Sequence, residues 1–493
     1  MRTAYSVETV RAAERELMAR LPEGALMQRA AAGLAAACAD LLGRVYGSRV
    51  VLLVGSGDNG GDALYAGARL ARRGAGVTAV LLAPERTHAG GLAALRRAGG
   101  GVLASEAPSE AGSSGDGFRS AAQSLIRRAD LVMDGIVGIG GKGGLRPDAV
   151  PPAEFAADSR AAVVAVDLPS GIEADTGEVR GAAVRADLTV TFGTHKPGLL
   201  IDPAREYAGS VRLVDIGLEL PDEAELEALQ HADVAARLPA PGAESDKYRR
   251  GVVGIAAGSA RYPGAAVLAV SGALRGGAGA VRYVGPAADA VIARFPETLV
   301  SDRGPARAGR VQAWVVGPGI GDDAGSVAEV LGAEVPVLVD ADGLRLADRS
   351  AVRARTAPTL MTPHAGEAAA LLGVSRESVE RARLASVREL AVRYGATVLL
   401  KGSTTLVADP GGGAVRVNPT GTAWLATAGS GDVLSGLAGA LLAAGLSALD
   451  AGSVGAYLHG LAGRFAAGGA PLGAHDVAAA IPEAWRDVRD TAR

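Results

Sequence analysis

The chain has 493 residues, of which 48% are hydrophobic, and its formal net charge is −3 at pH 7. That length allows two or three domains of roughly 100 to 200 residues, and the near balance of charge excludes a broad basic field for nucleic acid or an anionic membrane. A small molecule is therefore the expected partner. The single cysteine, Cys38, excludes an internal disulfide and predicts a reducing, cytoplasmic setting.

The first half alternates short apolar runs with alanine-rich stretches. The runs lie at residues 49–54, 77–82, 130–136, 162–167, 187–192 and 211–215. Spacers of helical length between most of them predict an α/β fold with a mainly parallel, doubly wound Rossmann-like sheet. The N-terminal residues carry charges throughout, which is typical of an amphipathic helix and not of a secretory signal.

The alternation begins again in the second half, with runs at residues 252–257, 281–284, 313–316, 336–340, 397–401 and 405–408. An acidic stretch that becomes rich in Pro, Gly and Ser separates the halves and predicts a connector. The predicted organisation is a domain at 1–220, a connector at 221–240 and a second α/β domain at 241–493. The most apolar segment, 433–452, contains Asp450 and is predicted to be a buried helix.

The loop after the first strand, "GSGDNGGD", has Gly55, Gly57 and Gly60 in the spacing G-x-G-x-x-G. One interpretation is a dinucleotide-binding loop, in which backbone N–H groups and a helix N-terminus face a pyrophosphate. Asp58 and Asp62 would repel that pyrophosphate unless a cation lies between them. The alternative is a tight strand-to-helix turn in which Asp and Asn cap the next helix.

Other polar residues follow later strands of the same half. Asp134 ends "DLVMD", and Asp167 ends "VVAVD" shortly before Ser170. The carboxyl ends of parallel strands meet at one edge, so these residues are expected to converge with Asn59 where open α/β sheets bind ligands. Their oxygen atoms suit a hard cation and not zinc. Each acid taken alone also fits a helix N-cap.

Four motifs carry a specific resemblance over about residues 1–220: "GSGDNGGD", "VMDGIVGIGGKGG", "VDLPSGI" and "TFGTHKPG". Together they resemble the NAD(P)H-hydrate epimerase family. That resemblance implies a potassium ion held by Asn59, Asp134 and Ser170. It also implies substrate binding by Asp58, Asn59, Gly60, Gly61, Asp62, Gly138, Ile139, Gly140, Gly141, Lys142, Gly143, Gly144 and Asp167.

Two positions depart from the family's spelling, because Asp58 stands where Asn is usual and Ala63 where Gly is usual. They leave open a noncatalytic dinucleotide-binding or assembly module. If the half is an epimerase, the hydroxyl of the hydrate would leave and return through an iminium-like intermediate. Asp167 would then lie near the reacting carbon, with Lys196 as a candidate catalytic acid or cation-stabilising group, or alternatively a surface residue.

In the second half, "AGSGDVLSG" places Gly429, Gly431 and Asp432 at the start of a long apolar helix. N–H groups there can hold a phosphoryl group while the carboxylate accepts a hydroxyl proton. The alternative is an acid favoured only by the helix dipole. "KGSTT" at 401–405 is either a phosphate-binding turn or a polar hairpin. In "TPHAGE", His364 is a candidate substrate contact and Glu367 fits a first helical turn.

Six ordered motifs, from "GSARYPGAAVLAVSGALRGGAGAV" through "GPGIG", "VLVDADGL", "TPHAGE" and "KGSTT" to "AGSGDVLSG", resemble the ribokinase-like fold and most closely the NAD(P)H-hydrate dehydratase family. The resemblance implies that ADP is used, and we expect Mg²⁺ to neutralise the charge of this nucleotide. The implied nucleotide-binding residues are Lys401, Gly402, Ser403, Thr404, Thr405 and Gly431. The implied substrate contacts are Ala265, Gly319, Gly321, His364 and Asp432, with Asp432 catalytic.

Together the two resemblances imply a fused repair enzyme. It would interconvert the R and S hydrates of NADH and NADPH (NADHX and NADPHX) and dehydrate the S form at the expense of ADP, giving AMP and phosphate. The alternative is a ribokinase-like small-molecule kinase carrying the noncatalytic module. Homo-oligomerisation is expected from the prevalence of oligomers among soluble enzymes.

Overall fold

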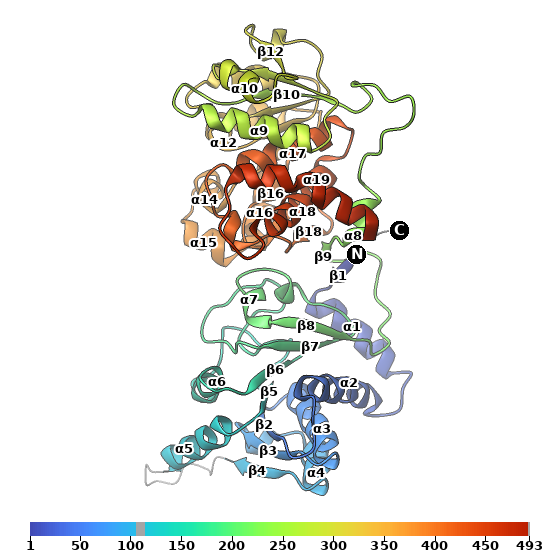
Figure 1. Ribbon diagram of the computed structural model, residues 1–493. Helices are drawn as coiled ribbons and strands as arrows, with labels where there is room; N and C mark the ends of the chain where they lie inside the picture. Colours follow the sequence, from blue (N-terminus) through green and yellow to red (C-terminus); the bar gives the residue numbers. More distant parts are fainter. Residues whose placement is uncertain (105–113, 492–493) are drawn as a thin grey trace. The chain divides into compact units, whose positions relative to one another are not determined.

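The computed structural model describes residues 1–104 and 114–491. The backbone divides into two compact units, which we call the first unit (Thr3–Glu225) and the second unit (Met1–Arg2 with Leu226–Arg493). Figure 1 labels many of their helices and strands. Both units are α/β with largely parallel sheets, which confirms the predicted fold class.

The first unit contains a parallel sheet in the order β4-β3-β2-β5-β6-β7-β8. The chain adds strands outward from β2 to β4, then returns to the other side of β2 and continues outward from β5 to β8. The strand order therefore reverses between β2 and β5, where doubly wound sheets bind ligands. The strands are β2 (Arg49–Val54), β3 (Gly76–Leu81), β4 (Gly101–Ala104), β5 (Leu131–Gly135), β6 (Ala162–Val166), β7 (Leu188–Phe192) and β8 (Ser210–Val214).

Helices cover both faces of this sheet, and alternate residues of β2 show why. Val50, Leu52 and Val54 are buried in one cluster with α2 and α3, whereas Val51 and Leu53 are buried in another with α5 and α6. The helices are α1 (Val7–Met18), α2 (Ala25–Leu42), α3 (Asp58–Arg72), α4 (Ala89–Arg97), α5 (Ser114–Arg127), α6 (Val150–Ala157) and α7 (Arg205–Ala208). Among the described helices, α2 alone is long and apolar enough to cross a membrane by length and composition.

The second unit has a sheet in the order β1-β9-β18-β17-β16-β15-β14-β13-β10-β11-β12. The strands are parallel from β16 to β12, whereas β17 runs antiparallel to both β16 and β18. The order reverses between β10 and β13. The strands are β1 (Arg2–Ala4), β9 (Leu226–Ala228), β10 (Val252–Ala256), β11 (Ala280–Val284), β12 (Leu299–Ser301), β13 (Ala313–Val316), β14 (Val337–Val339), β15 (Thr359–Met361), β16 (Thr397–Leu400), β17 (Thr405–Ala408) and β18 (Val415–Asn418).

The helices of the second unit differ from expectation at the most apolar segment. Residues 433–452, predicted to form one helix, belong to α17 and α18, which are separated at Gly445 where φ is +99°. Ser447 then caps α18 by accepting from the N–H of Asp450. The helices are α8 (His231–Ala235), α9 (Pro263–Arg275), α10 (Ala288–Arg294), α11 (Ala324–Leu331), α12 (Asp342–Leu346), α13 (Arg349–Arg353), α14 (Ala365–Leu372), α15 (Arg376–Arg381), α16 (Arg383–Tyr394), α17 (Ser430–Ala443), α18 (Ala448–Ala467) and α19 (Ala474–Thr491).

The segment 221–240, predicted to be a connector, also differs from expectation. It contains β9 and α8, and the units divide between Glu225 and Leu226. Leu229, Val234 and Leu238 lie buried in the main core cluster of the second unit. The acidic residues of this segment conceal an apolar face that the second unit needs for its core.

Helices α9 and α17 approach each other closely because glycine lines their contact. A Cβ atom at Gly436 would lie 1.9 Å from the carbonyl oxygen of Ala269, and one at Gly272 would lie 2.2 Å from that of Val433. Neither position has room for a side chain. Because α17 begins at Ser430, this contact fixes the place of its N-terminus.

We predict that Gly436→Ala lowers the free energy of unfolding by roughly 1 to 3 kcal/mol, because the added methyl group forces the two helices apart. Gly264→Ala is the matched control, since an added Cβ at Gly264 in the same helix pair has nothing within 4 Å. It should leave the free energy unchanged or raise it slightly. Urea unfolding followed by circular dichroism measures both, and equal effects would contradict the prediction.

Candidate active sites

The first unit has a cavity of about 490 Å³ at the reversal of its sheet. Residues 55–59 after β2 and residues 136–140 after β5 form two of its walls. Arg11 and Glu14 of α1 line it as well, together with Asp167 after β6. The cavity therefore lies where the strand order predicts a ligand.

Glycines bring the two loops of this cavity together. A Cβ at Gly55 would clash with the carbonyl oxygen of Ile136, and a Cβ at Gly138 would clash with the amide oxygen of Asn59. Gly60 similarly lies against the carbonyl oxygen of Gly55, with only 2.6 Å for a Cβ. The glycines of "GSGDNGGD" thus permit close contact between loops, while Asp58 is exposed in the first turn of α3.

Asp134 and Ser170 meet as expected at the ends of β5 and β6. The Ser170 hydroxyl donates to Asp134 Oδ1 at 2.6 Å, and the Ser170 N–H donates to Asp134 Oδ2 at 2.8 Å. Burial raises the pKa of Asp134 to about 6 even though these hydrogen bonds oppose the shift. Asn59 uses its amide N–H₂ to donate to the carbonyl oxygen of Val166, which leaves its oxygen as an acceptor against Gly138.

Lys196 is buried, with 1% of its surface exposed, and forms an ion pair with Asp167. Its ammonium group donates to Asp167 Oδ1 at 2.5 Å, to the Thr191 hydroxyl at 3.1 Å and to the carbonyl oxygen of Phe192 at 3.0 Å. These three bonds account for all three ammonium hydrogens. Asp167 itself has a φ of +66°, an uncommon conformation that is typical of functional sites. The alternative of a surface lysine is therefore wrong.

Two further carboxyl groups face this cavity. Asp62 is buried, and its Oδ1 atom has no hydrogen-bond partner. Burial first, and then the nearby charges of Asp167, Asp58 and Glu14, raise the pKa of Asp62 well above its usual range. Burial also raises the pKa of Glu14, against the opposing charge of Lys196.

Glu14 was missed from the sequence, although a signal existed. It lies four residues after Val10 and three before Leu17, both buried, and thus on the face that α1 turns inward. The glycine-rich loop is only partly at the cavity, because Gly138, Ile139 and Gly140 line it whereas residues 141–144 are not among its lining.

In the second unit, Asp432 stands in the first turn of α17 near a buried ion pair. Lys401 Nζ donates to Asp340 Oδ1 at 2.7 Å, and the Ser435 hydroxyl donates to Asp340 Oδ2 at 2.6 Å. Burial and then the negative charge of Asp340 raise the pKa of Asp432 to about 7, against the opposing charge of Lys401. A carboxyl with that pKa can accept a proton near neutral pH.

The loop 401–405 is held from beneath by Arg383 of α16. The Arg383 guanidinium donates to the carbonyl oxygens of Leu400, Lys401 and Thr404. A Cβ at Gly402 would lie 2.3 Å from the same guanidinium. Gly402 and Ser403 are exposed, whereas Thr404 is buried and Thr405 half-buried. The turn therefore presents its tip to solvent while its base is fixed.

His364 caps α14, since its Nδ1 accepts from the N–H groups of Gly366 at 3.0 Å and Glu367 at 3.1 Å. Glu367 accepts in return from the N–H of His364 at 2.7 Å, which confirms its predicted place in the first helical turn. The His364 side chain is exposed, and its Nε2 lies 3.5 Å from Glu367 Oε1.

The "GPGIG" loop lies where the second sheet reverses. Gly319 and Gly321 both have positive φ, and a Cβ at Gly319 would lie 2.7 Å from that of Ala265. The N–H of Gly321 donates to Asp342 Oδ2 at 3.0 Å. Because Asp342 also raises the pKa of Asp432, it connects this loop to the acidic cluster electrostatically.

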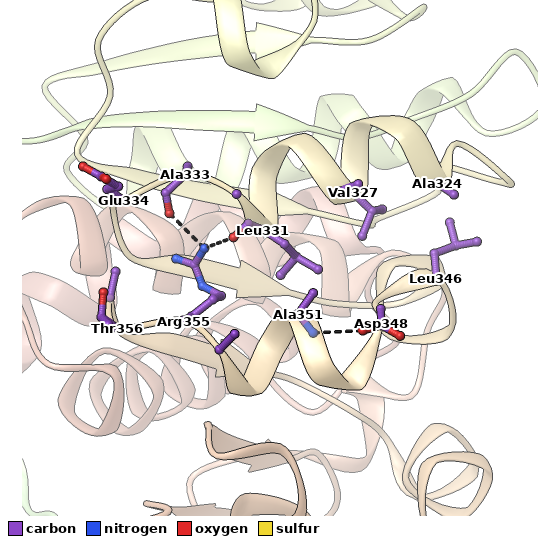
Figure 2. Close-up of a pocket in the computed structure, with 14 residues that line it drawn as sticks. Ala324, Val327, Leu331, Ala333, Glu334, Leu346, Asp348, Ala351, Arg355 and Thr356 are labelled. Carbon is purple, nitrogen blue, oxygen red and sulfur yellow. Dashed lines mark hydrogen bonds between the residues drawn. The ribbon is translucent and has the colours of Figure 1, made fainter.

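The second unit also has a cavity of about 560 Å³ between α11 and α13, away from these residues (Figure 2). Its Arg355 guanidinium donates to the carbonyl oxygens of Leu331, Ala333 and Val335. Asp348 caps α13 by accepting from the N–H of Ala351. These polar groups serve the ends of secondary structure, and the cavity is not a candidate catalytic site.

Two family models match the chain: a YjeF-related protein N-terminus at residues 23–198 and NAD(P)H-hydrate dehydratase at residues 253–482. The bifunctional NAD(P)H-hydrate repair enzyme of Mycobacterium leprae is 49% identical, over 95% of this chain and 94% of that one. Its counterpart from Mycobacterium tuberculosis H37Rv is 51% identical, over 92% and 91%. An ADP/ATP-dependent NAD(P)H-hydrate dehydratase from Bacillus subtilis, crystallised with ATP and Mg²⁺, is 28% identical, with a TM-score of 0.49, over 53% of this chain and 99% of that one.

We predict that Asp340→Asn lowers the pKa of Asp432 from about 7. The substitution removes a neighbouring negative charge and releases Lys401 from its ion pair, and both changes favour the ionised carboxylate. Carbon-13 NMR of aspartate-labelled protein measures the pKa, with Asp432→Asn to identify the signal. Asp302→Asn, at an exposed position, is the control. An unchanged or higher pKa in Asp340→Asn would contradict the electrostatic account.

Proposed function

Because this chain belongs to the family of bifunctional NAD(P)H-hydrate repair enzymes, we propose that its first unit epimerises the hydrates and its second unit dehydrates them at the expense of ADP. The observation that carries the proposal is the presence of two acidic sites on one chain. One lies at the sheet reversal of the first unit, and the other lies around Asp432 in the second. Each falls within the stretch that one of the two family models matches.

In the second unit, Asp432 accepts the proton of the ring hydroxyl of the S hydrate. The hydroxyl oxygen bonds to the β-phosphorus of ADP, and the bond from that phosphorus to the bridging oxygen breaks, releasing AMP. The new phosphate ester then leaves the ring as phosphate, driven by the lone pair of the ring nitrogen. Loss of a proton from the adjacent carbon completes the reduced nicotinamide.

The nucleotide would lie on residues 401–405 and Gly431. Lys401 supplies a positive charge whose place is fixed by Asp340, and the exposed tip of the turn supplies N–H and hydroxyl donors. Among the residues described, no group of three His, Cys, Asp or Glu side chains is arranged to hold a metal ion. A magnesium ion held largely by the phosphates of ADP would neutralise their negative charge.

In the first unit, Asn59, Asp134 and Ser170 would hold a potassium ion. The carboxyl group of Asp134 is buried, and burial disfavours its ionised form. The side-chain N–H₂ of Asn59 donates to the carbonyl oxygen of Val166, so the side-chain oxygen of Asn59 remains an acceptor. A cation there would offset the cost of the buried charge and attract the anionic part of the substrate. Asp167, held by Lys196, would lie near the reacting carbon.

We predict that Asp432→Asn slows ADP-dependent recovery of the reduced nicotinamide by roughly 10²- to 10⁴-fold, because the amide cannot accept the hydroxyl proton. In the unsubstituted enzyme the rate should rise as pH increases through about 7, where Asp432 ionises. The absorbance of the reduced nicotinamide measures both. Asp302→Asn should behave as the unsubstituted chain, and a variant Asp432→Asn with nearly full activity would exclude the assigned role.

We predict that potassium stabilises the first unit against heat more than lithium does at equal ionic strength. Burial raises the pKa of Asp134 in the folded chain from 3.8 to about 6. The folded state therefore loses stability as pH rises from about 4 to about 6, because over that range the carboxyl ionises more readily in the unfolded chain. The potassium effect should therefore appear as pH rises through 6, and Asp134→Asn should remove it. Differential scanning calorimetry measures the shift, and equal shifts in both salts would argue against the site.

A further inference from the structure

The cavity of the first unit contains acidic groups that the proposed chemistry has not used, and Asp62 is the most buried of them. Asp62 belongs to α3, is 7% exposed and lines the cavity. Its Oδ1 atom is buried without a hydrogen-bond partner. An oxygen in that state is costly unless a ligand or a bound proton satisfies it.

The charged groups around Asp62 favour the protonated form. Asp167, Asp58 and Glu14 all lie near enough to act on it, and each is a carboxyl group. Lys196, the buried cation of this cluster, already donates to three acceptors, one of which is Asp167. The local cation is thus committed to a neighbouring carboxylate.

This arrangement separates two roles. Asp167 Oδ1 accepts from Lys196, from the Thr191 hydroxyl and from the N–H of Phe192, so it is an acceptor already surrounded by donors. Lys196 has no ammonium hydrogen left to give to a substrate without breaking one of its bonds. Among the buried side-chain oxygens of this cluster that the structure describes, Asp62 Oδ1 alone has no hydrogen-bond partner.

We propose that Asp62, and not Lys196, is the catalytic acid of the first unit, an inference that rests on the proposed epimerase function. Its protonated carboxyl donates to the ring hydroxyl as the carbon–oxygen bond breaks, and the hydroxyl leaves as water. The lone pair of the ring nitrogen forms the nitrogen–carbon double bond of the cation. Water then adds to either face of that carbon, and its extra proton returns to the Asp62 carboxylate.

The test uses the full chain, mixed hydrate epimers and ADP in water enriched in oxygen-18. Dehydration by the second unit should consume the S form in a fast phase, after which the R form disappears at the rate of epimerisation. In Asp62→Asn we expect the fast phase to persist and the slow phase to fall by about 10²-fold or more, toward the rate without protein. Entry of oxygen-18 into the remaining hydrate should fall by the same factor.

Asp158→Asn is the matched control, because it makes the same change at an exposed residue of the first unit. A slow phase in Asp62→Asn within a few-fold of the unsubstituted rate would overturn the proposal, as would a higher KM with unchanged kcat. If the unsubstituted chain shows no slow phase faster than the protein-free rate, the epimerase function fails instead.

The pH profile of the unsubstituted chain is a second test, which does not depend on how the variant folds. Because the acid must carry its proton, catalysed epimerisation should slow as pH rises and Asp62 ionises. A rate that increases with pH would overturn the proposal. Circular dichroism of Asp62→Asn should show an intact fold, since a neutral amide replaces a carboxyl that burial already disfavours in its charged form.

Discussion

Both units depend on carboxyl groups buried at the carboxyl edge of a parallel sheet. Asp134, Asp167 and Asp340 stand at or just after strands whose other residues are apolar, and each is almost inaccessible to water. Taking a carboxylate out of water is expensive unless donors or a cation replace the water. Many of the hydrogen bonds and ion pairs around the two sites offset this cost.

The two units offset the cost of burying a carboxylate in a similar way. In each, one lysine is bound to a carboxylate that follows a strand: Lys196 to Asp167 and Lys401 to Asp340. In each unit the lysine forms its ion pair with that carboxylate and not with a second carboxyl group nearby, which is Asp62 in the first unit and Asp432 in the second. Their raised pKa values follow from burial and from neighbouring negative charge. In each unit, therefore, one carboxylate holds the lysine in place, and a different carboxyl group has the raised pKa that suits proton transfer.

Much of this organisation can be predicted from the sequence. The apolar runs and their spacing predict parallel sheets, and the polar residues after the runs predict where the sites lie. The strands from "RVVLLV" to "TLVA" all formed, within a residue or two at each end. Short strands such as β12 and β15 were missed. Glu14 and Arg383 were missed for another reason: they come from helices, and only packing brings them to a site that strand ends define. The prediction of a connector at 221–240 was wrong, because the acidic residues of this segment concealed the apolar face around Val234.

The turn at 401–405 has a consequence for how this sequence can diverge. The Arg383 guanidinium occupies the space that a side chain at position 402 would fill, and it also bonds the carbonyl oxygens that shape the turn. A larger residue at 402 requires the arginine side chain to move away from the turn or to be replaced. Likewise, loss of the arginine removes the reason for glycine at 402. The two positions should therefore co-vary among relatives, and a larger residue at 402 should be rare wherever position 383 is arginine.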